Sequence, residues 1–430
     1  MHEETFDFRN VMSSNDFSEN YRLDPLSTLL SMGLDKDHTW FRIGRRYGLL
    51  INAPTLLQAV MTDRSFIRGK VSRNLKHLFG AGLGALDGEL HRQHRNVLRP
   101  AFAGSIVENL YAPTIAEETT NFAEHMKGNE TFDIFSTISS FLVYLTAKNL
   151  FGADWHDHAE SIALCLRTGS RYLVGQSAHP GESFSQNASG YFHPPLEQVL
   201  NEIINHYDGT EDLRRAISFI FKEGMAQSAW TLDTAKDEMR FLLVAGVETT
   251  AATASFALDL LARNSRIQDE VYNEVTPLFS QGRPISQDDL RSLRWLTWVI
   301  KETLRLFPPI WVFTREASRD VVIQELVIPK GSLVLLSAYL TQRDGRYFTN
   351  PLDFVPERFS ERISPWKYFP FGGGHRHCLG EGYGVTTLSY ILINMLRYWK
   401  LAVTDNAPLD IEPASTLTPR GKHLLTLERR

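Results

Sequence analysis

The sequence predicts a mainly α-helical fold with small β-sheets. Between residues 89 and 224, apolar side chains recur every three to four positions, which is the spacing of amphipathic helices. A further run of about 30 residues ends near Arg263 and would span about 45 Å as one helix, enough to cross the whole molecule. By contrast, residues 41–52 and 321–340 contain short apolar segments separated by turn formers, as the strands of small sheets do.

The expected elements follow one another without a Pro- or Gly-rich hinge, so we expect a single domain over residues 1–430. Gly175–Pro195 is rich in turn formers and is expected to be a loop at the entrance of a site. Thr231 and Asp233 are good caps for the start of the long helix. The expected elements are strands within 41–52, helices over 89–103, 105–126, 134–151, 156–173, 195–224, 231–263, 266–280 and 288–306, strands within 321–340, and a helix from after Cys378 to about Trp399.

Composition excludes several classes of function. The 45 Lys and Arg against 50 Asp and Glu give a net charge of −5, so a nucleic-acid partner is not expected. Cys165 and Cys378 are the two cysteines, too few for a disulfide framework, which favours a reducing, cytoplasmic location. The polar start and the lack of a long uninterrupted apolar run predict no signal peptide and no membrane span, and we expect a monomer.

Cys378 lies in the stretch FPFGGGHRHCLG, just before a predicted helix. Three glycines before it permit unusual backbone angles and the close approach of a flat ligand. The helix N-terminus favours a thiolate, which is a metal ligand. Zinc held by His375, His377 and Cys378 is one alternative, a buried core cysteine is another, and a non-covalent haem with one axial thiolate is the third.

The stretch resembles the haem-binding loop of the cytochrome P450 family, Phe-x-x-Gly-x-Arg-x-Cys-x-Gly. The matching positions are Phe371, Gly374, Arg376, Cys378 and Gly380. The resemblance implies the cytochrome P450 fold, with a long central helix over a buried haem b and Cys378 as the axial ligand of its iron. It is closest to the soluble, bacterial-type members of the family.

Two further segments agree with this resemblance. Glu302 and Arg305 in KETLRLFPP match the family's Glu-x-x-Arg, and Arg358 in NPLDFVPERF completes a Glu-Arg-Arg network. In the family these residues hold the protein core on the cysteine side of the haem. Taken alone, Glu302 and Arg305 are also compatible with an ordinary solvated ion pair three residues apart on a helix.

AGVETT lies in the middle of the predicted long helix. Ala245 and Gly246 leave room for a ligand against the helix, and Glu248 and Thr249 supply a carboxyl and a hydroxyl group. In the family this acid–alcohol pair delivers protons during oxygen activation. The alternative is that Thr249 only bonds to the carbonyl one turn earlier and that Glu248 is solvated.

A cationic set is expected to bind the haem carboxylates. His91 and Arg95 in HRQHRNVLRPAF are four residues apart on one helix face, and Arg315 and Arg376 fit the family's other contacts. Gly384 departs from the family, which often has Ala there, and is expected to loosen the packing below the haem slightly.

The resemblance implies a monooxygenase that uses O2 and electrons from NAD(P)H through a separate ferredoxin or flavodoxin and its reductase. Arg92 and Arg99 are candidates for docking that partner. The pocket candidates are apolar and predict a hydrophobic small molecule, such as a terpenoid, polyketide, fatty acyl or aromatic compound of secondary metabolism. The residues predicted to line this pocket are Phe79–Leu86, Phe241, Leu242, Val244 and Ile310–Phe313.

Other functions stay open from the sequence alone. A haem-thiolate enzyme can also desaturate or epoxidise its substrate, or isomerise it without electrons, and the substrate can be bound to a carrier. A haem gas sensor and a zinc-binding structural protein are the two non-enzymatic alternatives.

Overall fold

A computed structural model describes residues 16–43, 46–69, 76, 80–128, 131–177, 193–207, 215–226, 230–280, 283–405 and 407–430. Within these residues the chain is mainly helical with small sheets, and the predicted fold class is confirmed. The α-helices are α2 (Ser18–Leu23), α3 (Pro25–Gly33), α4 (Pro54–Thr62), α6 (Gly88–Leu98), α7 (Gly104–Ile106), α8 (Ala112–Glu124), α9 (Ile134–Phe151), α10 (Ala159–Ser177), α11 (His193–His206), α12 (Ala216–Phe219), α13 (Leu232–Arg263), α14 (Ser265–Phe279), α15 (Gln287–Ser292), α16 (Arg294–Leu306), α17 (Ala338–Thr341) and α18 (Glu381–Tyr398).

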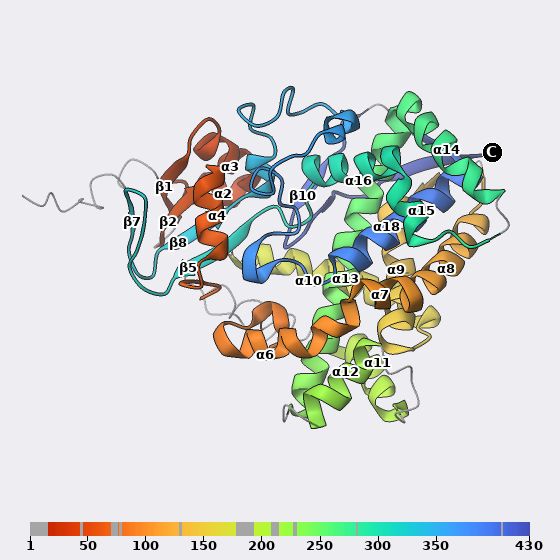
Figure 1. Cartoon of the computed structure of the whole chain (residues 1–430), viewed down its shortest axis with the longest axis horizontal. Coiled ribbons are helices and arrows are strands. Elements are labelled where there is room, and N and C mark those ends of the chain that lie inside the picture. Colours follow the sequence, from red (N-terminus) through yellow and green to blue (C-terminus); the bar gives the residue numbers. More distant parts are fainter. Residues whose placement is uncertain are drawn as a thin grey trace, which may run out of the picture.

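Helix α13 is the long helix that the sequence predicts. The Thr231 hydroxyl accepts a hydrogen bond from the Thr234 N–H at 3.2 Å and so caps its start. Its 32 residues correspond to about 48 Å, and it runs through the middle of the molecule (Figure 1). Most of its C-terminal half is buried on all sides, with α9 packed along it, so the helix forms the centre of the core.

The strands form four small sheets. Most of them gather at the end of the molecule away from α14 and α15 (Figure 1). The largest sheet has the order β1-β2-β8-β5-β3, in which β2 and β8 are parallel and the other pairs are antiparallel. The strands are β1 (His38–Ile43), β2 (Arg46–Ile51), β3 (Phe66–Ile67), β4 (Thr131–Asp133), β5 (Phe313–Ala317), β6 (Val321–Ile323), β7 (Leu326–Ile328), β8 (Leu333–Leu336), β9 (Trp399–Val403), β10 (Ile411–Pro413), β11 (Leu417–Pro419) and β12 (Leu424–Arg429).

Two predicted helices are divided in the structure. The expected helix 195–224 is instead α11, followed by α12 and a π-helical turn over Ile220–Met225; the sequence between them contains Asp208-Gly209, a turn signal. The expected helix 288–306 is divided into α15 and α16 at Leu293, which has extended backbone angles. The Glu274 carboxylate accepts the N–H groups of the first three residues of α16 at 2.6–3.1 Å and so stabilises a new helix start.

Some other expectations also change. Residues 338–341 form the short helix α17, although the apolar run through Leu340 predicted a strand. The predicted entrance loop Gly175–Pro195 lies largely outside the described residues. Two helices, α9 and α13, are long and apolar enough to cross a membrane by composition. However, 67% and 78% of their apolar windows are buried inside the protein, which is typical of core helices.

Candidate functional site

The glycines before Cys378 allow this loop to lie directly on other parts of the protein. Gly372 and Gly374 have φ angles of +70° and +63°, which glycine adopts without strain. A Cβ on Gly374 would lie 2.1 Å from the Met61 carbonyl oxygen at the end of α4, and one on Gly372 would touch the Phe313 ring at 3.2 Å. The sequence predicted that these glycines make room for a flat ligand. At these two positions they instead make room for α4 and β5 to contact the loop closely.

Cys378 sits at the inner end of this loop. Its N–H donates to the Phe371 carbonyl at 3.0 Å, which closes the turn, and its side chain is accessible although protein surrounds it. Burial raises the pKa of the Cys378 thiol, and the Gly380 N–H and the Arg95 charge only partly oppose this. The predicted thiolate at a helix N-terminus is therefore not supported for the protein alone, because α18 begins only at Glu381 and burial dominates. A bound metal would provide the missing positive charge.

A cluster of guanidinium groups faces the same region. The cluster contains Arg315, Arg376 and also Arg68, which no motif had indicated. Burial, together with repulsion from the neighbouring arginines, lowers the pKa of Arg315 to about 10 and that of Arg68 to about 9. Asp87 pairs with Arg376, and its carboxylate also accepts the N–H groups of Arg68 and Gly69 at 3.0 and 3.1 Å. Arg68 Nε and Arg376 Nε and Nη1 are buried without a hydrogen-bond partner in the described structure. Three cations beside one carboxylate form a site that favours further negative charge.

His91 and Arg95 complete this site from α6. His91 is 7% exposed, and burial together with Arg376 and Arg95 lowers its pKa to about 3. His91 is therefore neutral, and it can contribute an N–H donor but not the positive charge that the sequence predicts for it. Arg95 is half-buried and close enough to Cys378 for the two charges to interact.

One face of α13 is open near the middle of the helix, just before its packed C-terminal half. Ala245 is exposed and Thr249 is half-exposed, although most residues that follow them on the helix are buried. The Thr249 hydroxyl donates to the Ala245 carbonyl at 2.8 Å, the local bond that the sequence left as an alternative. Gly246 points elsewhere, because a Cβ there would meet Thr146 of α9 at 3.4 Å. Ala245 thus leaves room on the open face, whereas Gly246 allows two helices to pack closely.

Glu248 lies on a different side of α13 from Ala245. It is 5% exposed, and its Oε2 accepts a hydrogen bond from the Thr416 hydroxyl at 2.9 Å. Burial raises its pKa to about 7, although hydrogen bonds from Thr416 and Ser170 oppose the shift. The carboxyl group is therefore not solvated, and it exchanges a proton near neutral pH.

The sequence comparisons agree with this geometry. The family model described as "Cytochrome P450" matches residues 36–427. The chain belongs to the cytochrome P450 family. It is 28% identical over 411 residues to a protein named cyclooctatin synthase from Streptomyces melanosporofaciens, which covers 92% of this chain and 89% of the relative.

Two other relatives show how broad the likeness is. Pentalenene oxygenase from Streptomyces avermitilis is 25% identical over 92% of this chain and 90% of its own length. Human cytochrome P450 4V2 is 27% identical over 89% of this chain and 80% of its own length. The resemblance noted from the Cys378 loop is therefore confirmed at the level of the family.

The residues of this cytochrome P450 fit the haem that the family implies. The Cys378 sulfur is accessible, partnerless guanidinium nitrogens lie nearby, and the open face of α13 carries the small residue Ala245. Haem carries two carboxylates, which match the excess positive charge around Asp87. Among the described residues no three His, Cys, Asp or Glu side chains form a metal-binding group, so His375, His377 and Cys378 do not gather as the zinc alternative requires.

The remaining motifs of this cytochrome P450 form a buried network of ion pairs. Glu302 and Arg305 are both fully buried, with Glu302 oxygens 2.7 and 2.8 Å from two guanidinium nitrogens of Arg305. Arg358 Nε donates to the same carboxylate at 2.9 Å. The solvated ion pair that the sequence left open is therefore excluded. Gly384 faces α13, where a Cβ would lie 4.0 Å from the Thr250 hydroxyl, so there is room for the alanine that the family often has at this position.

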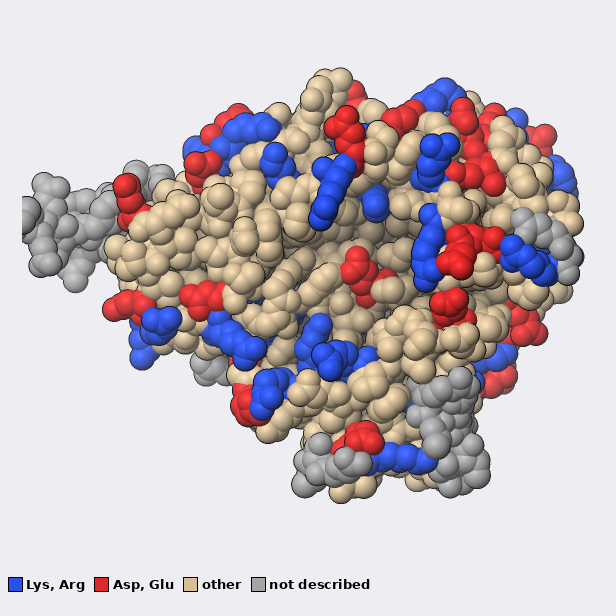
Figure 2. All heavy atoms as spheres, in the orientation of Figure 1, with Lys and Arg blue, Asp and Glu red and all other residues tan. Residues whose placement is uncertain are grey.

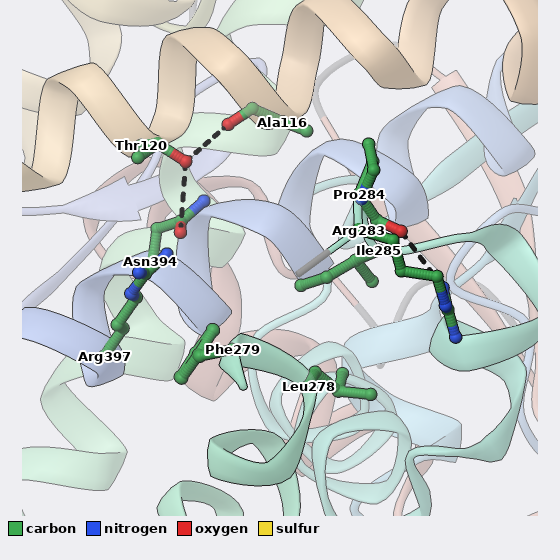
Figure 3. A pocket seen from close by; sticks show the side chains of 9 residues that line it. All are labelled: Ala116, Thr120, Leu278, Phe279, Arg283, Pro284, Ile285, Asn394 and Arg397. Carbon is green, nitrogen blue, oxygen red and sulfur yellow. Dashed lines mark hydrogen bonds between the residues drawn. The ribbon is translucent and has the colours of Figure 1, made fainter. Parts of the chain in front are cut away.

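A second hollow of about 370 Å³ lies away from this site, between α8, α14 and α18 (Figure 3). On one side of the hollow the Thr120 hydroxyl donates a hydrogen bond to Asn394, and Arg397 and Phe279 line another part. Asn394 is 13 residues beyond the start of α18, or about 20 Å along that helix. The hollow is therefore separate from the Cys378 site.

Proposed function

We propose that the enzyme inserts one oxygen atom from O2 into a C–H bond of a hydrophobic small molecule. The observation that carries this proposal is the accessible Cys378 with a cationic cluster beside it, in a chain whose central helix α13 leaves Ala245 and Thr249 uncovered. A thiolate ligand favours O–O cleavage, and the arginine cluster suits the two carboxylates of haem b. When bound, the haem supplies the oxygen-activating chemistry.

The protein residues around the haem would have separate roles. Cys378 is the axial ligand of the iron, and Phe371 and Gly380 hold its turn through their backbone groups. Arg315, Arg376 and the newly indicated Arg68 neutralise the carboxylates, while Arg95 adds charge and His91 adds an N–H donor. Because these groups come from four parts of the chain, they would fix the orientation of the cofactor.

Thr249 and Glu248 are proposed to handle protons. The Thr249 hydroxyl donates its hydrogen bond to the Ala245 carbonyl, so its lone pairs are available to accept a hydrogen bond on the open face. Glu248 holds its proton at Oε1 or Oε2 near neutral pH, where it can both take up and release it. The two groups lie on neighbouring sides of α13, so a water molecule would have to connect them.

The substrate is proposed to be a terpenoid or a similar apolar molecule of secondary metabolism. Phe241 and Phe313 are half-buried, and Leu83 belongs to the core that adjoins α13. Trp311 packs instead in a separate core with Leu26 and Phe41, so it does not support the predicted pocket. The names of pentalenene oxygenase and of a further relative, cyclooctat-9-en-7-ol 5-monooxygenase from Streptomyces melanosporofaciens, refer to a hydrocarbon and an alcohol. These names support an apolar substrate but do not identify it.

Electrons are proposed to come from NAD(P)H through a separate ferredoxin or flavodoxin and its reductase. Positive side chains lie over the part of the surface where α6 runs (Figure 2). Arg92 is already paired with Glu89 at 2.5 Å, so Arg99 is the better of the two candidates for docking an acidic partner. We also propose that the chain acts as one catalytic domain, as a monomer in the cytoplasm.

An absorption spectrum of the reduced protein with carbon monoxide tests this function. We expect a Soret band shifted to the red, as thiolate-ligated haem gives, and its loss in Cys378→Ser. Cys165→Ser is the matched control, because Cys165 is buried in α10 and its substitution should leave the band in place. A colourless protein from haem-sufficient cells, or an unchanged band in Cys378→Ser, would overturn the proposal.

A further inference from the structure

Two adjacent carboxylates near the start of α13 hold the segment 80–86. The Ala81 N–H donates to Asp237 Oδ2 at 2.7 Å, and the Leu83 N–H donates to Glu238 Oε2 at 3.0 Å. The segment therefore hydrogen-bonds to α13 through its backbone, although its sequence consists only of Gly, Ala and Leu.

The glycines of this segment allow it to lie directly on the helix. A Cβ on Gly80 would lie 2.0 Å from the Asp237 carboxylate, and one on Gly84 would lie 2.1 Å from the Phe241 ring. A Cβ on Gly82 would lie 2.7 Å from both the Asp237 carbonyl and Phe241 Cβ. No other residue type fits this approach without displacing α13 or the Phe241 ring.

Glu238 has a second partner on another element. Its Oε1 lies 2.6 Å from His94 Nδ1, and the two side chains are 0% and 7% exposed. The His94 ring also packs on Trp230, with ring centroids 4.3 Å apart. One buried carboxylate thus joins α13, the segment 80–86 and α6, the helix that carries His91 and Arg95.

Glu238 lies on the same side of α13 as the open face. Successive helical residues are about 100° apart, which places Glu238, Ala245 and Thr249 within about 40° of one another. Along the axis Ala245 is about 10 Å and Thr249 about 16 Å from Glu238. The segment that Glu238 holds therefore closes one end of the open face.

We propose that His94 and Glu238 form a positioning pair that fixes residues 81–86 as a wall of the substrate site. The inference rests on the proposed function, because it takes the open face of α13 as the place where substrate binds. Neither side chain is placed to touch the reacting atoms. If the carboxylate is removed, the Leu83 N–H and the His94 ring lose their buried acceptor, and the wall must be reordered each time a bulky ligand binds.

Imidazole ligands of two sizes test this pair in the haem-loaded protein, because both bind iron and shift its absorption spectrum. Imidazole needs space only near the iron, whereas 1-(triphenylmethyl)imidazole is large enough to reach the wall. We expect Glu238→Ala to weaken binding of the large ligand about tenfold or more and that of imidazole less than about twofold. Glu238→Gln should recover part of the loss, since its amide oxygen can still accept one of the two hydrogen bonds.

Hydrogen exchange gives a second readout that does not depend on bound haem. In Glu238→Ala the amides of residues 81–86 should exchange faster, while those of α18 should keep the wild-type rate. Asp233→Asn is the matched control, because Asp233 is an exposed acid in the first turn of the same helix. If Glu238→Ala does not fold, His94→Phe replaces it, since it keeps an aromatic ring against Trp230 and removes only the bond to Glu238.

The outcomes separate this inference from the proposed function. A wild-type protein without a haem spectrum overturns the proposed function, whereas the exchange experiment still reports on the wall. A normal haem spectrum with equal losses for both imidazole ligands, or unchanged exchange at residues 81–86, overturns the positioning pair alone.

Discussion

At the scale of single residues, Glu248 combines burial with a hydroxyl partner in a way that makes it sensitive to pH. Its pKa of about 7 lies above the ordinary value of 4.5. Between these two values the folded protein keeps a proton that the unfolded chain has lost, so stability falls as the pH rises through this window. The shift in pKa corresponds to a loss of at most about 3 kcal/mol in the free energy of unfolding, and this loss is complete above pH 7.

Glu248→Gln should therefore stabilise the protein at pH 8 by up to about 3 kcal/mol and have little effect near pH 4. Urea unfolding at several pH values measures this. Glu160→Gln, at an exposed position on α10, controls for the loss of one negative charge. The prediction is wrong if Glu248→Gln changes stability equally at both pH values.

The sequence indicated candidate site residues but not their full surroundings. Cys378, Arg315, Arg376, His91 and Arg95 come from short motifs with fixed spacing, so each could be named before the structure. Arg68 and Asp87 could not, because only the fold brings the end of β3 and the start of α6 to the Cys378 loop. The charge of His91 could not be read from the sequence, because burial and neighbouring arginines, which no local pattern reports, lower its pKa.

At the scale of elements, the loop before Cys378 needs glycine at position 374 for two reasons: its positive φ angle and its close contact with α4. Gly374→Ala would place a side chain at φ +63°, which costs about 1–2 kcal/mol, and against the Met61 carbonyl. With the displacement of α4 added, we expect a loss of about 2–5 kcal/mol and weaker haem retention.

Gly382→Ala is the comparison for this substitution. Gly382 lies in the first turn of α18, and a Cβ there would meet nothing within 4 Å. It should be neutral or stabilise the protein by up to about 1 kcal/mol, since alanine is the better helix former. Thermal unfolding of both variants measures the difference, and equal effects would show that the loop does not need its close contact with α4.

Element boundaries depend on contacts that sequence periodicity does not contain. The long helix α13 and helix α9 were predicted almost to the residue, because both have strong apolar patterns with clear caps or breaks. The division of 288–306 into α15 and α16 had no comparable signal, because the carboxylate that caps α16 belongs to Glu274 on another helix. Short strands such as β3 and β4 were missed because two or three residues carry too little pattern.

At the scale of the whole molecule, buried arginine side chains lie together where the protein is expected to bind a cofactor. Burial first, and repulsion from neighbouring arginines second, lowers the pKa of Arg68 to about 9 and that of Arg315 to about 10. Both groups are still charged below pH 9, so the cost to folding is fully present, and constant, between pH 6 and 8. We therefore expect folding and haem binding to be coupled, because a dicarboxylate that binds only the folded protein relieves this repulsion.

Asp87→Asn should show this coupling. Among the described residues Asp87 is the carboxylate that pairs with Arg376, so its loss should destabilise the haem-free protein by about 2 kcal/mol or more. The haem-loaded protein should lose less, because the two haem carboxylates remain as counter-ions. Denaturant unfolding of both forms, prepared from haem-deficient and haem-sufficient cells, gives the two values. Equal losses would contradict the coupling and would mean that Asp87 acts only by anchoring the Arg68 and Gly69 backbone.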